Sequence, residues 1–259
     1  MAPDSNRTFP SANAFSLIEL AIVLAILGLL TGAILGGRAL LDGAELRQTL
    51  GELQKYRSAY LQFNDQYNAM PGDMSDATTI WGADPNGCPT HSTRVPGKAT
   101  CDGNNDGVIA AEEIFRAWQH LSNAELVEGT YTGVAGVNGS AHAVPGANVP
   151  SGQLERSGYS IRSLGLVSGN ANYYANSSEA EIYLGESSAS NYTYVALFEP
   201  EQQYSMDVKI DDGKPSTGAL RSFKSPLNPS CTTSDDETAE IDYQLDTQTP
   251  ACTLIYVLE

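Results

Sequence analysis

The chain has 259 residues, with 31 Asp and Glu against 14 Lys and Arg, and a formal net charge of −17. Its apolar share of 41% and charged share of 17% are typical of a globular protein and unlike a disordered polyanion. The acidity argues against a surface that binds the phosphates of nucleic acids, so we expect no direct nucleic-acid binding. The mean hydropathy of −0.23 argues against several membrane spans but permits one.

The charge is unevenly distributed along the chain. Residues 1–67 hold 6 acidic and 5 basic side chains, a net charge of −1, whereas residues 68–259 hold 25 and 9, a net charge of −16. This division predicts a nearly neutral N-terminal part followed by a strongly acidic remainder.

An apolar segment lies near the N-terminus. Residues 20–37 form an uncharged run of 18 residues, which is the lower end of the length that spans a bilayer as a helix. A cleaved secretory signal would have a shorter apolar core and a basic leader, and residues 1–14 hold one Arg and one Asp. A plain membrane anchor explains the length but not Glu19, because a carboxylate at the edge of an apolar helix is costly without a partner.

Residues 14–19 read AFSLIE, a small residue followed by Phe and, four residues later, Glu. This string resembles the cleavage site of type IV prepilins and type II secretion pseudopilins. The resemblance implies that prepilin peptidase cuts after Ala14, that Phe15 becomes the methylated N-terminus, and that Glu19 is the assembly carboxylate. A charge-assisted bond between Glu19 and the α-amino group of a neighbouring subunit would neutralise both charges in an apolar filament core.

The same resemblance implies a location and partners. The precursor would lie in the bacterial inner membrane before it is processed. It would then join other pilin or pseudopilin subunits in a periplasmic or extracellular filament.

An amphipathic stripe follows the apolar run. Aromatic and leucine side chains recur at spacings of three and four residues, which predicts that the helix continues with one apolar face: Leu46, Leu50, Leu53, Tyr56, Tyr60, Phe63 and Tyr67. Pro71 and Gly72 mark its expected end.

We therefore expect three parts in the chain. Residues 1–14 form a leader peptide, residues 15–70 a long helix with its transmembrane or filament-core segment at 17–37, and residues 71–259 a globular head. The expected fold is α+β, with the second half of the long helix packed on an antiparallel sheet. Short runs rich in β-branched and aromatic residues predict the strands, at Tyr159–Leu166, Glu181–Leu184, Tyr192–Phe198, Ala239–Tyr243 and Thr253–Leu258.

Four cysteines lie in the predicted head, at Cys88, Cys101, Cys231 and Cys252. None is in CxxC spacing and the chain has only three histidines, which argues against a zinc site. An even number of cysteines in an exported domain predicts disulfides, and pairing between sequence neighbours is the simplest of the three connectivities. The second pair would then close a C-terminal loop like the disulfide-bounded region of many pilins.

Residues 102–113 read DGNNDGVIAAEE and align with the calcium loop of an EF-hand. The pattern places oxygen ligands at alternating positions around a sharp turn at Gly107, namely Asp102, Asn104, Asp106, the carbonyl of Val108 and the bidentate Glu113. Residues 112–121 are a plausible exiting helix. The preceding segment is too rich in Pro and Gly for an entering helix, and a Cys88–Cys101 bridge could replace it. We expect a structural calcium ion here, with a polar surface turn as the alternative.

A second acidic segment, residues 206–215, lacks a metal spacing and predicts a turn at Asp212-Gly213. The chain contains no nucleophile elbow, phosphate loop or dinucleotide motif, so we do not expect an enzyme. The sequence favours a structural subunit of a type IV pilus or a type II secretion filament. The alternative is a membrane-anchored calcium-binding surface protein that does not polymerise.

Overall fold

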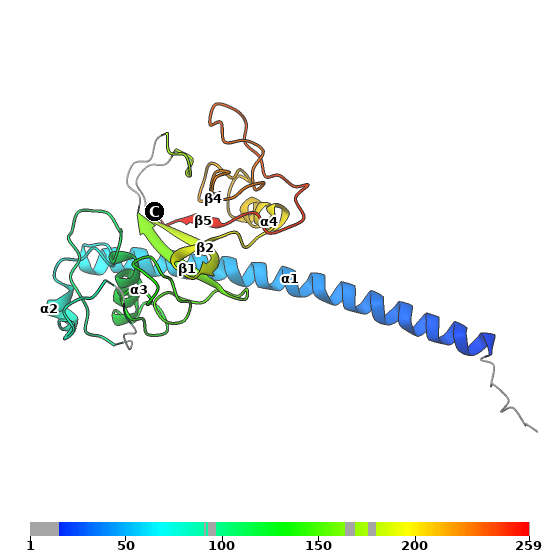
Figure 1. Cartoon of the computed structure of the whole chain (residues 1–259), viewed down its shortest axis with the longest axis horizontal. Coiled ribbons are helices and arrows are strands. Elements are labelled where there is room, and N and C mark those ends of the chain that lie inside the picture. The colour runs from blue at the N-terminus through cyan, green and yellow to red at the C-terminus, as the bar shows by residue number, and fades with distance from the viewer. Residues whose placement is uncertain (1–15, 91, 93–96, 164–168, 176–179, 259) are drawn as a thin grey trace, which may run out of the picture. The chain divides into compact units, whose positions relative to one another are not determined.

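A computed structural model describes residues 16–90, 92, 97–163, 169–175 and 180–258. Ala14 and Phe15 lie outside this range. The elements in chain order are α1 (Leu17–Tyr67), α2 (Ala77–Trp81), α3 (Glu113–Asn123), β1 (Ser157–Ser163), β2 (Ala180–Ser188), β3 (Asn191–Val195), α4 (Pro200–Ile210), β4 (Leu220–Ser222) and β5 (Leu254–Val257) (Figure 1). The fold is α+β, as predicted.

The chain divides into two compact units, residues 1–44 and 45–259. Helix α1 contributes to both, because its C-terminal part supplies core residues to the second unit, which we call the head. The predicted stripe is confirmed: Leu53, Tyr60 and Phe63 are completely buried. The helix ends at Tyr67, and Asn68 follows in the left-handed conformation with φ 51°. Asn tolerates that conformation and commonly follows a helix C-terminus, so α1 ends before Pro71 is reached.

The sheet is antiparallel throughout. Its order is β1-β2-β5-β4, with β3 paired to the far end of β2. Alternate residues point to opposite faces of a sheet, and one face carries Ile161, Ile182 and Tyr256, which are in register across three strands and join the core that contains the α1 stripe. Figure 1 shows the sheet lying across the second half of α1, with α3 and α4 at its two ends.

A polar contact also ties the helix to this face of the sheet. The hydroxyl of Tyr159 donates a hydrogen bond of 2.5 Å to a carboxylate oxygen of Glu52 in α1, and the amide of Gln153 donates to the other oxygen. Burial and the contact with Glu52 raise the pKa of Tyr159 far above its usual value, so the hydroxyl stays protonated and can donate.

The opposite face of the sheet is covered as well. Tyr183, Phe223 and Ile255 form a second buried cluster, against which Tyr173 and Tyr194 pack. The Tyr183 and Phe223 rings lie 5.3 Å apart. Because both faces are buried, the sheet is a central layer of the head rather than its surface.

Four of the predicted strand regions are strands, at β1, β2, β3 and β5. The prediction of a strand at residues 239–243 is wrong, because Tyr243 forms only an isolated bridge with Thr232. The edge strand next to β5 is the three-residue β4, which carries too few residues to show an alternating pattern.

Candidate assembly segment and metal site

The first turn of α1 is capped from both directions. The Oγ of Ser16 accepts a hydrogen bond from the backbone N–H of Ile18 at 3.3 Å, and a carboxylate oxygen of Glu19 accepts one from the N–H of Ser16 at 2.9 Å. The two bonds satisfy amides at the start of the helix that otherwise lack partners. The negative charge of Glu19 is also favoured there by the helix dipole. In the sequence, Glu19 lies four residues after Phe15, at which cleavage after Ala14 would create an α-amino group.

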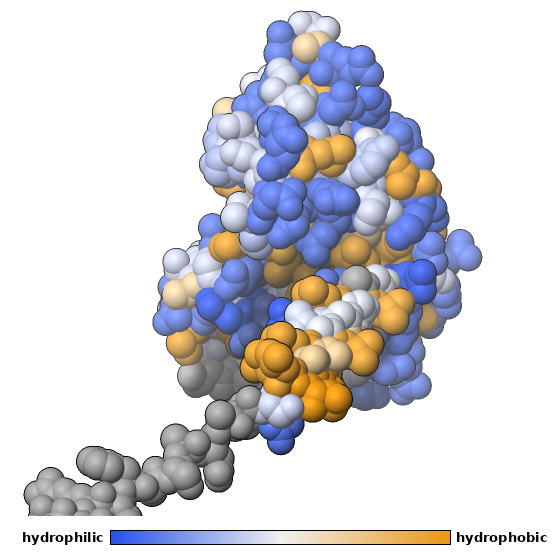
Figure 2. All heavy atoms as spheres, turned by 90° about the vertical axis from the view of Figure 1, so that its right-hand side faces the viewer, coloured by the Kyte–Doolittle hydropathy of each residue, from blue (hydrophilic) through white to orange (hydrophobic). Residues whose placement is uncertain are grey.

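The helix that follows Glu19 is apolar and exposed. Its best 18-residue window has a mean hydropathy of 2.5, and α1 is long and apolar enough to cross a membrane. Leu17, Leu29 and Leu40 expose 76–88% of their surface. Figure 2 shows apolar side chains gathered on the end of the helix that faces the viewer, while the head surface is mostly polar. Burying such a surface requires a membrane or other helices.

The predicted calcium loop wraps around a residue that the motif does not contain. Asp73, which follows the end of α1, accepts hydrogen bonds from the N–H groups of Asp106 at 3.1 Å and Gly107 at 2.9 Å. Gly103 crosses the Asp73 backbone so closely that a Cβ atom would lie 2.2 Å from the Asp73 carbonyl carbon. Gly107 turns the chain with φ 80°, as its place in the motif predicts.

Three carboxylates meet inside this loop. Oxygen atoms of Asp73, Asp106 and Glu113 all lie within 4.8 Å of one another. Glu113 begins α3 and accepts hydrogen bonds of 3.2 Å from the N–H groups of Asn104 and Ala110. Burial, and then the nearby charges of Asp73 and Asp106, raise the pKa of Glu113 against the lowering effect of those amides. A cation placed between the three carboxylates would relieve their repulsion.

Two of the predicted ligands, Asp106 and Glu113, are thus brought together, and a third, Asn104, donates its amide to Asp106 at 2.9 Å. Asp102 is directed elsewhere. Its two oxygens accept hydrogen bonds from the N–H and hydroxyl of Thr78, at 2.7 and 2.9 Å, and so cap the short helix α2. Asp102 and Asn104 line the same open hollow of about 310 Å³ as Asp106 and Glu113.

A disulfide anchors the chain just before the loop. Cys88 and Cys101 are bonded, and Cys101 is buried. Next to it, Asp84 and Thr100 are joined by a backbone hydrogen bond of 2.8 Å. Cys101 directly precedes the loop, at the place in the chain where an EF-hand has its entering helix. The exiting helix is present as α3, with Ile114, Phe115, Trp118 and Leu121 buried.

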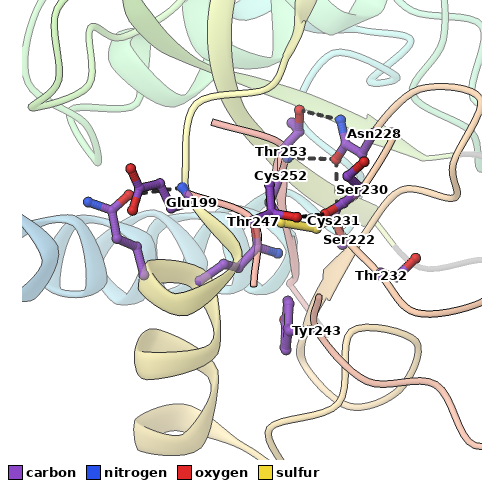
Figure 3. The surroundings of a disulfide bond; sticks show 12 residues. Glu199, Ser222, Asn228, Ser230, Cys231, Thr232, Tyr243, Thr247, Cys252 and Thr253 are labelled. Atoms are coloured by element: carbon purple, nitrogen blue, oxygen red, sulfur yellow. Dashed lines mark hydrogen bonds between the residues drawn. A yellow bond between two sulfur atoms is a disulfide. The ribbon is translucent and has the colours of Figure 1, made fainter. Parts of the chain in front are cut away.

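The second disulfide joins Cys231 to Cys252, so both bonds have the neighbour pairing that the sequence favoured. Buried residues surround this disulfide, and hydrogen bonds join several of them (Figure 3). Asn228 accepts a hydrogen bond from the N–H of Thr253 at 2.6 Å and donates one to its hydroxyl at 3.1 Å. The bridge thereby fixes both ends of an acidic loop, residues 231–252, to the start of β5.

Three more carboxylates come together within residues 206–215, whose spacing did not predict a metal site. Oxygens of Asp207, Asp211 and Asp212 lie within 4.8 Å of one another where α4 ends, and the turn predicted at Asp212-Gly213 follows. Asp207 accepts hydrogen bonds from the Tyr243 hydroxyl at 2.8 Å and the Gly213 N–H at 3.2 Å. Burial raises its pKa to about 7. Its partners give it a structural role between α4 and the acidic loop.

Residues 10–35 match the model of the prokaryotic N-terminal methylation motif, which is the prepilin-type signal of type IV pilins and pseudopilins. The predicted resemblance is thus confirmed over this segment. The motif implies processing by prepilin peptidase and assembly with other pilins, and with the apolar helix it fits a membrane-anchored precursor. No curated protein and no solved structure matches the chain.

Proposed function

We propose that this chain is the precursor of a structural subunit of a type IV pilus or type II secretion filament. In this proposal it is held in the bacterial inner membrane, cut after Ala14 and assembled through α1 into a periplasmic or extracellular filament. The observation that carries the proposal is the methylation motif at residues 10–35, which leads directly into an exposed apolar helix with Glu19 in its first turn. Such motifs mark structural proteins, so the proposed role is not enzymatic.

Two measurements test this function. Mass spectrometry of the membrane-derived protein should find an N-terminus at Phe15 that carries a methyl group. The variant Glu19→Ala should be absent from sheared filaments although its head folds normally, because the α-amino group of a neighbour then lacks its counter-charge in an apolar core. Asp42→Ala, which removes an exposed acid farther along the same helix, is the matched control and should assemble.

The alternative function is an anchored surface protein that does not polymerise. It predicts an intact leader at steady state, and equal behaviour of Glu19→Ala and Asp42→Ala. Finding both would reject the filament subunit. The negative charge of the head still argues against direct nucleic-acid capture by this chain.

We also propose that the head holds a structural calcium ion at Asp73, Asp106 and Glu113. The support is the spacing of residues 102–113 together with the convergence of these three carboxylates. Calcium at about 100 times its Kd would stabilise the native head by about 2.7 kcal/mol. For a domain of this size the melting temperature would rise by about 5–10 °C.

Variants distinguish this arrangement from an EF-hand ligand set. Asp73→Asn and Glu113→Gln should each abolish the calcium-dependent rise in melting temperature. Asp102→Ala should lower stability by weakening the α2 cap but should keep the calcium-dependent rise. If Asp102→Ala abolishes the rise and Asp73→Asn keeps it, the EF-hand set is correct. If calcium and EDTA give the same melting curve for the unsubstituted protein, the site does not bind calcium.

A further inference from the structure

A groove of about 540 Å³ runs between α1 and the end of α4, which lie side by side in the head (Figure 1). Helix α1 contributes Arg57 and Leu61 to its lining, and α4 contributes Lys209 and Ile210. Leu61 exposes 40% of its surface. The groove therefore combines two cationic side chains with an accessible apolar one.

These cations differ from five other cations of the head. Five cations, Lys55, Lys98, Arg156, Lys214 and Lys224, each form an ion pair with a carboxylate of the same chain. Arg57 donates its Nε hydrogen to the carbonyl of Leu258 at 3.1 Å, and neither Arg57 nor Lys209 has an ion pair with any carboxylate in the described residues. Within the described residues, the two positive charges of this groove thus have no carboxylate partner, on a head whose residues 45–259 carry a net charge of −16.

The acidic loop between Cys231 and Cys252 carries the complementary feature. It holds six acids and no base. Five of the acids are already engaged through ion pairs or hydrogen bonds within the chain, namely Asp235, Asp236, Glu237, Glu240 and Asp242. Asp246 has neither an ion pair nor a side-chain hydrogen bond within the described residues, and the preceding Leu245 exposes 46% of its surface. An exposed leucine beside a free carboxylate matches the composition of the groove.

We propose that this groove binds Leu245 and Asp246 of a second copy of the chain. The Asp246 carboxylate pairs with Arg57 and Lys209, while Leu245 packs on Leu61 and Ile210. Oppositely charged surfaces of this kind fix the register between partners and speed their encounter. No residue of the acidic loop lines the groove on the same molecule, so the two surfaces are separate.

The contact is heterologous, because one surface of each copy binds a different surface of the next. Contacts of this type propagate into open helical assemblies unless they close into a ring. The inference therefore rests on the proposed filament: α1 would supply the apolar assembly, and the groove would set the relation between successive heads.

Cysteine cross-linking in membranes and in sheared filaments tests the contact on the full chain. One copy carries Leu61→Cys and a differently tagged copy carries Leu245→Cys. We expect a disulfide between the two copies. Val137→Cys in place of Leu61→Cys is the matched control, since Val137 is exposed to 53% and lies outside the groove, and it should yield about tenfold less.

Charge reversal provides the second readout. Asp246→Lys and Lys209→Glu should each lower the cross-linking yield by about tenfold, and the two changes combined, one on each copy, should restore it. Asp65→Lys, at an exposed acid of α1, should have little effect. Failure of the combined variant to recover, or a yield equal to that of the Val137 control, overturns the contact.

The outcomes separate this inference from the proposed function. Filaments that form normally without the cross-link reject the groove and leave the filament subunit standing. A cross-link in membranes of cells that make no filament supports the groove and rejects the filament role. A Leu61→Cys copy that captures a different pilin-like subunit, and never its own kind, shows that the groove binds a partner other than a second copy.

Discussion

The two halves of α1 belong to one continuous helix but have opposite relations to water. In the first half, Leu17, Leu20 and Leu27 each expose more than half of their surface. In the second half, Leu53, Tyr60 and Phe63 are fully buried. The first half is apolar on all sides, whereas the second half has one apolar face. A helix that is apolar all round must be buried in a membrane or among other helices, while an amphipathic helix packs one face on a core.

The comparison shows that helix formation alone does not assign a role to α1. Both halves satisfy their backbone hydrogen bonds internally, so the distribution of side chains around the axis decides what each half contacts. Substitutions that distinguish these environments should therefore have separable effects on head stability and on membrane retention.

The largest expected effect is in the second half. Phe63→Ala removes a fully buried ring that lies 4.5 Å from the ring of Tyr67 and 6.3 Å from that of Trp81. We expect the free energy of unfolding of the head to fall by about 3–5 kcal/mol. Urea unfolding of the detergent-solubilised chain, followed by tryptophan fluorescence, measures this loss. Membrane retention should not change, and a variant that loses retention instead would contradict the separation of the two halves.

The next effect is in the first half. Leu27→Arg places a charge in the middle of the apolar segment and should cost about 2.5–3.5 kcal/mol of membrane insertion free energy. Alkaline extraction of membranes should release more of this variant, with no change in the unfolding of the head. Gln62→Arg, on the exposed side of the second half, is the control and should behave like the unsubstituted chain. Equal extraction of both variants would show that the first half is not inserted.

A pH dependence sharpens the description of how the second half meets the head. His120 is fully buried, its ring stacks on Phe63, and it accepts a hydrogen bond from the Gly72 N–H at 3.0 Å. Burial lowers its pKa to about 3, from about 6.5 in the unfolded chain. Below pH 6.5 the unfolded state binds a proton that the folded state excludes, so stability falls as the pH decreases towards 3.

Between pH 7 and pH 5 this single group should lower the free energy of unfolding by about 2 kcal/mol. The change in the free energy of unfolding between pH 7 and pH 5 should therefore shrink by about 2 kcal/mol in His120→Gln. It should stay the same in His142→Gln. Burial of Asp207, whose pKa is raised to about 7, acts in the opposite direction, because its folded state holds the proton more tightly. An unchanged pH dependence in His120→Gln would show that this ring titrates normally in the folded head.

The smallest effect is on the exposed side of the second half. Lys55 pairs with Glu128 at 3.0 Å, and the two side chains expose 51% and 92% of their surface. Water and salt screen such a pair, so Lys55→Ala should change the free energy of unfolding by about 0.5 kcal/mol or less. Urea unfolding at low and high salt checks this. If Lys55→Ala lowers the free energy of unfolding as much as Phe63→Ala does, this side of the helix is not exposed to solvent.

Local patterns predicted much of the head correctly because they depend on near neighbours in the chain. The stripe of α1, the face of α3 and the turn at Gly107 all follow from spacing within a few residues. The neighbour pairing of the cysteines succeeded as well, at sequence separations of 13 and 21. Residues 239–243 failed as a strand because strand formation needs a partner strand, which no local pattern supplies.

The candidate metal site illustrates the limit of spacing. Asp106 and Glu113 were found from the loop motif, but Asp73 lies 33 residues before Asp106 in sequence and enters only because the chain folds back beside Gly103. Asp102 occupies the first motif position yet turns to Thr78, 24 residues away. A metal ion would compete with the N–H of Thr78 in α2 for the Asp102 carboxylate, and spacing does not show which of them binds it.

The sequence by itself determined the N-terminal signal, the apolar first half of α1 and the acidity of the head, since each is a property of a contiguous segment. The tertiary structure alone decided which carboxylates converge, and which cations of the groove beside α4 and which acid of the C-terminal loop have no ion-pair partner among the described residues. These features depend on distances between residues far apart in the chain, which are set when the sheet, α3 and α4 pack against the second half of α1.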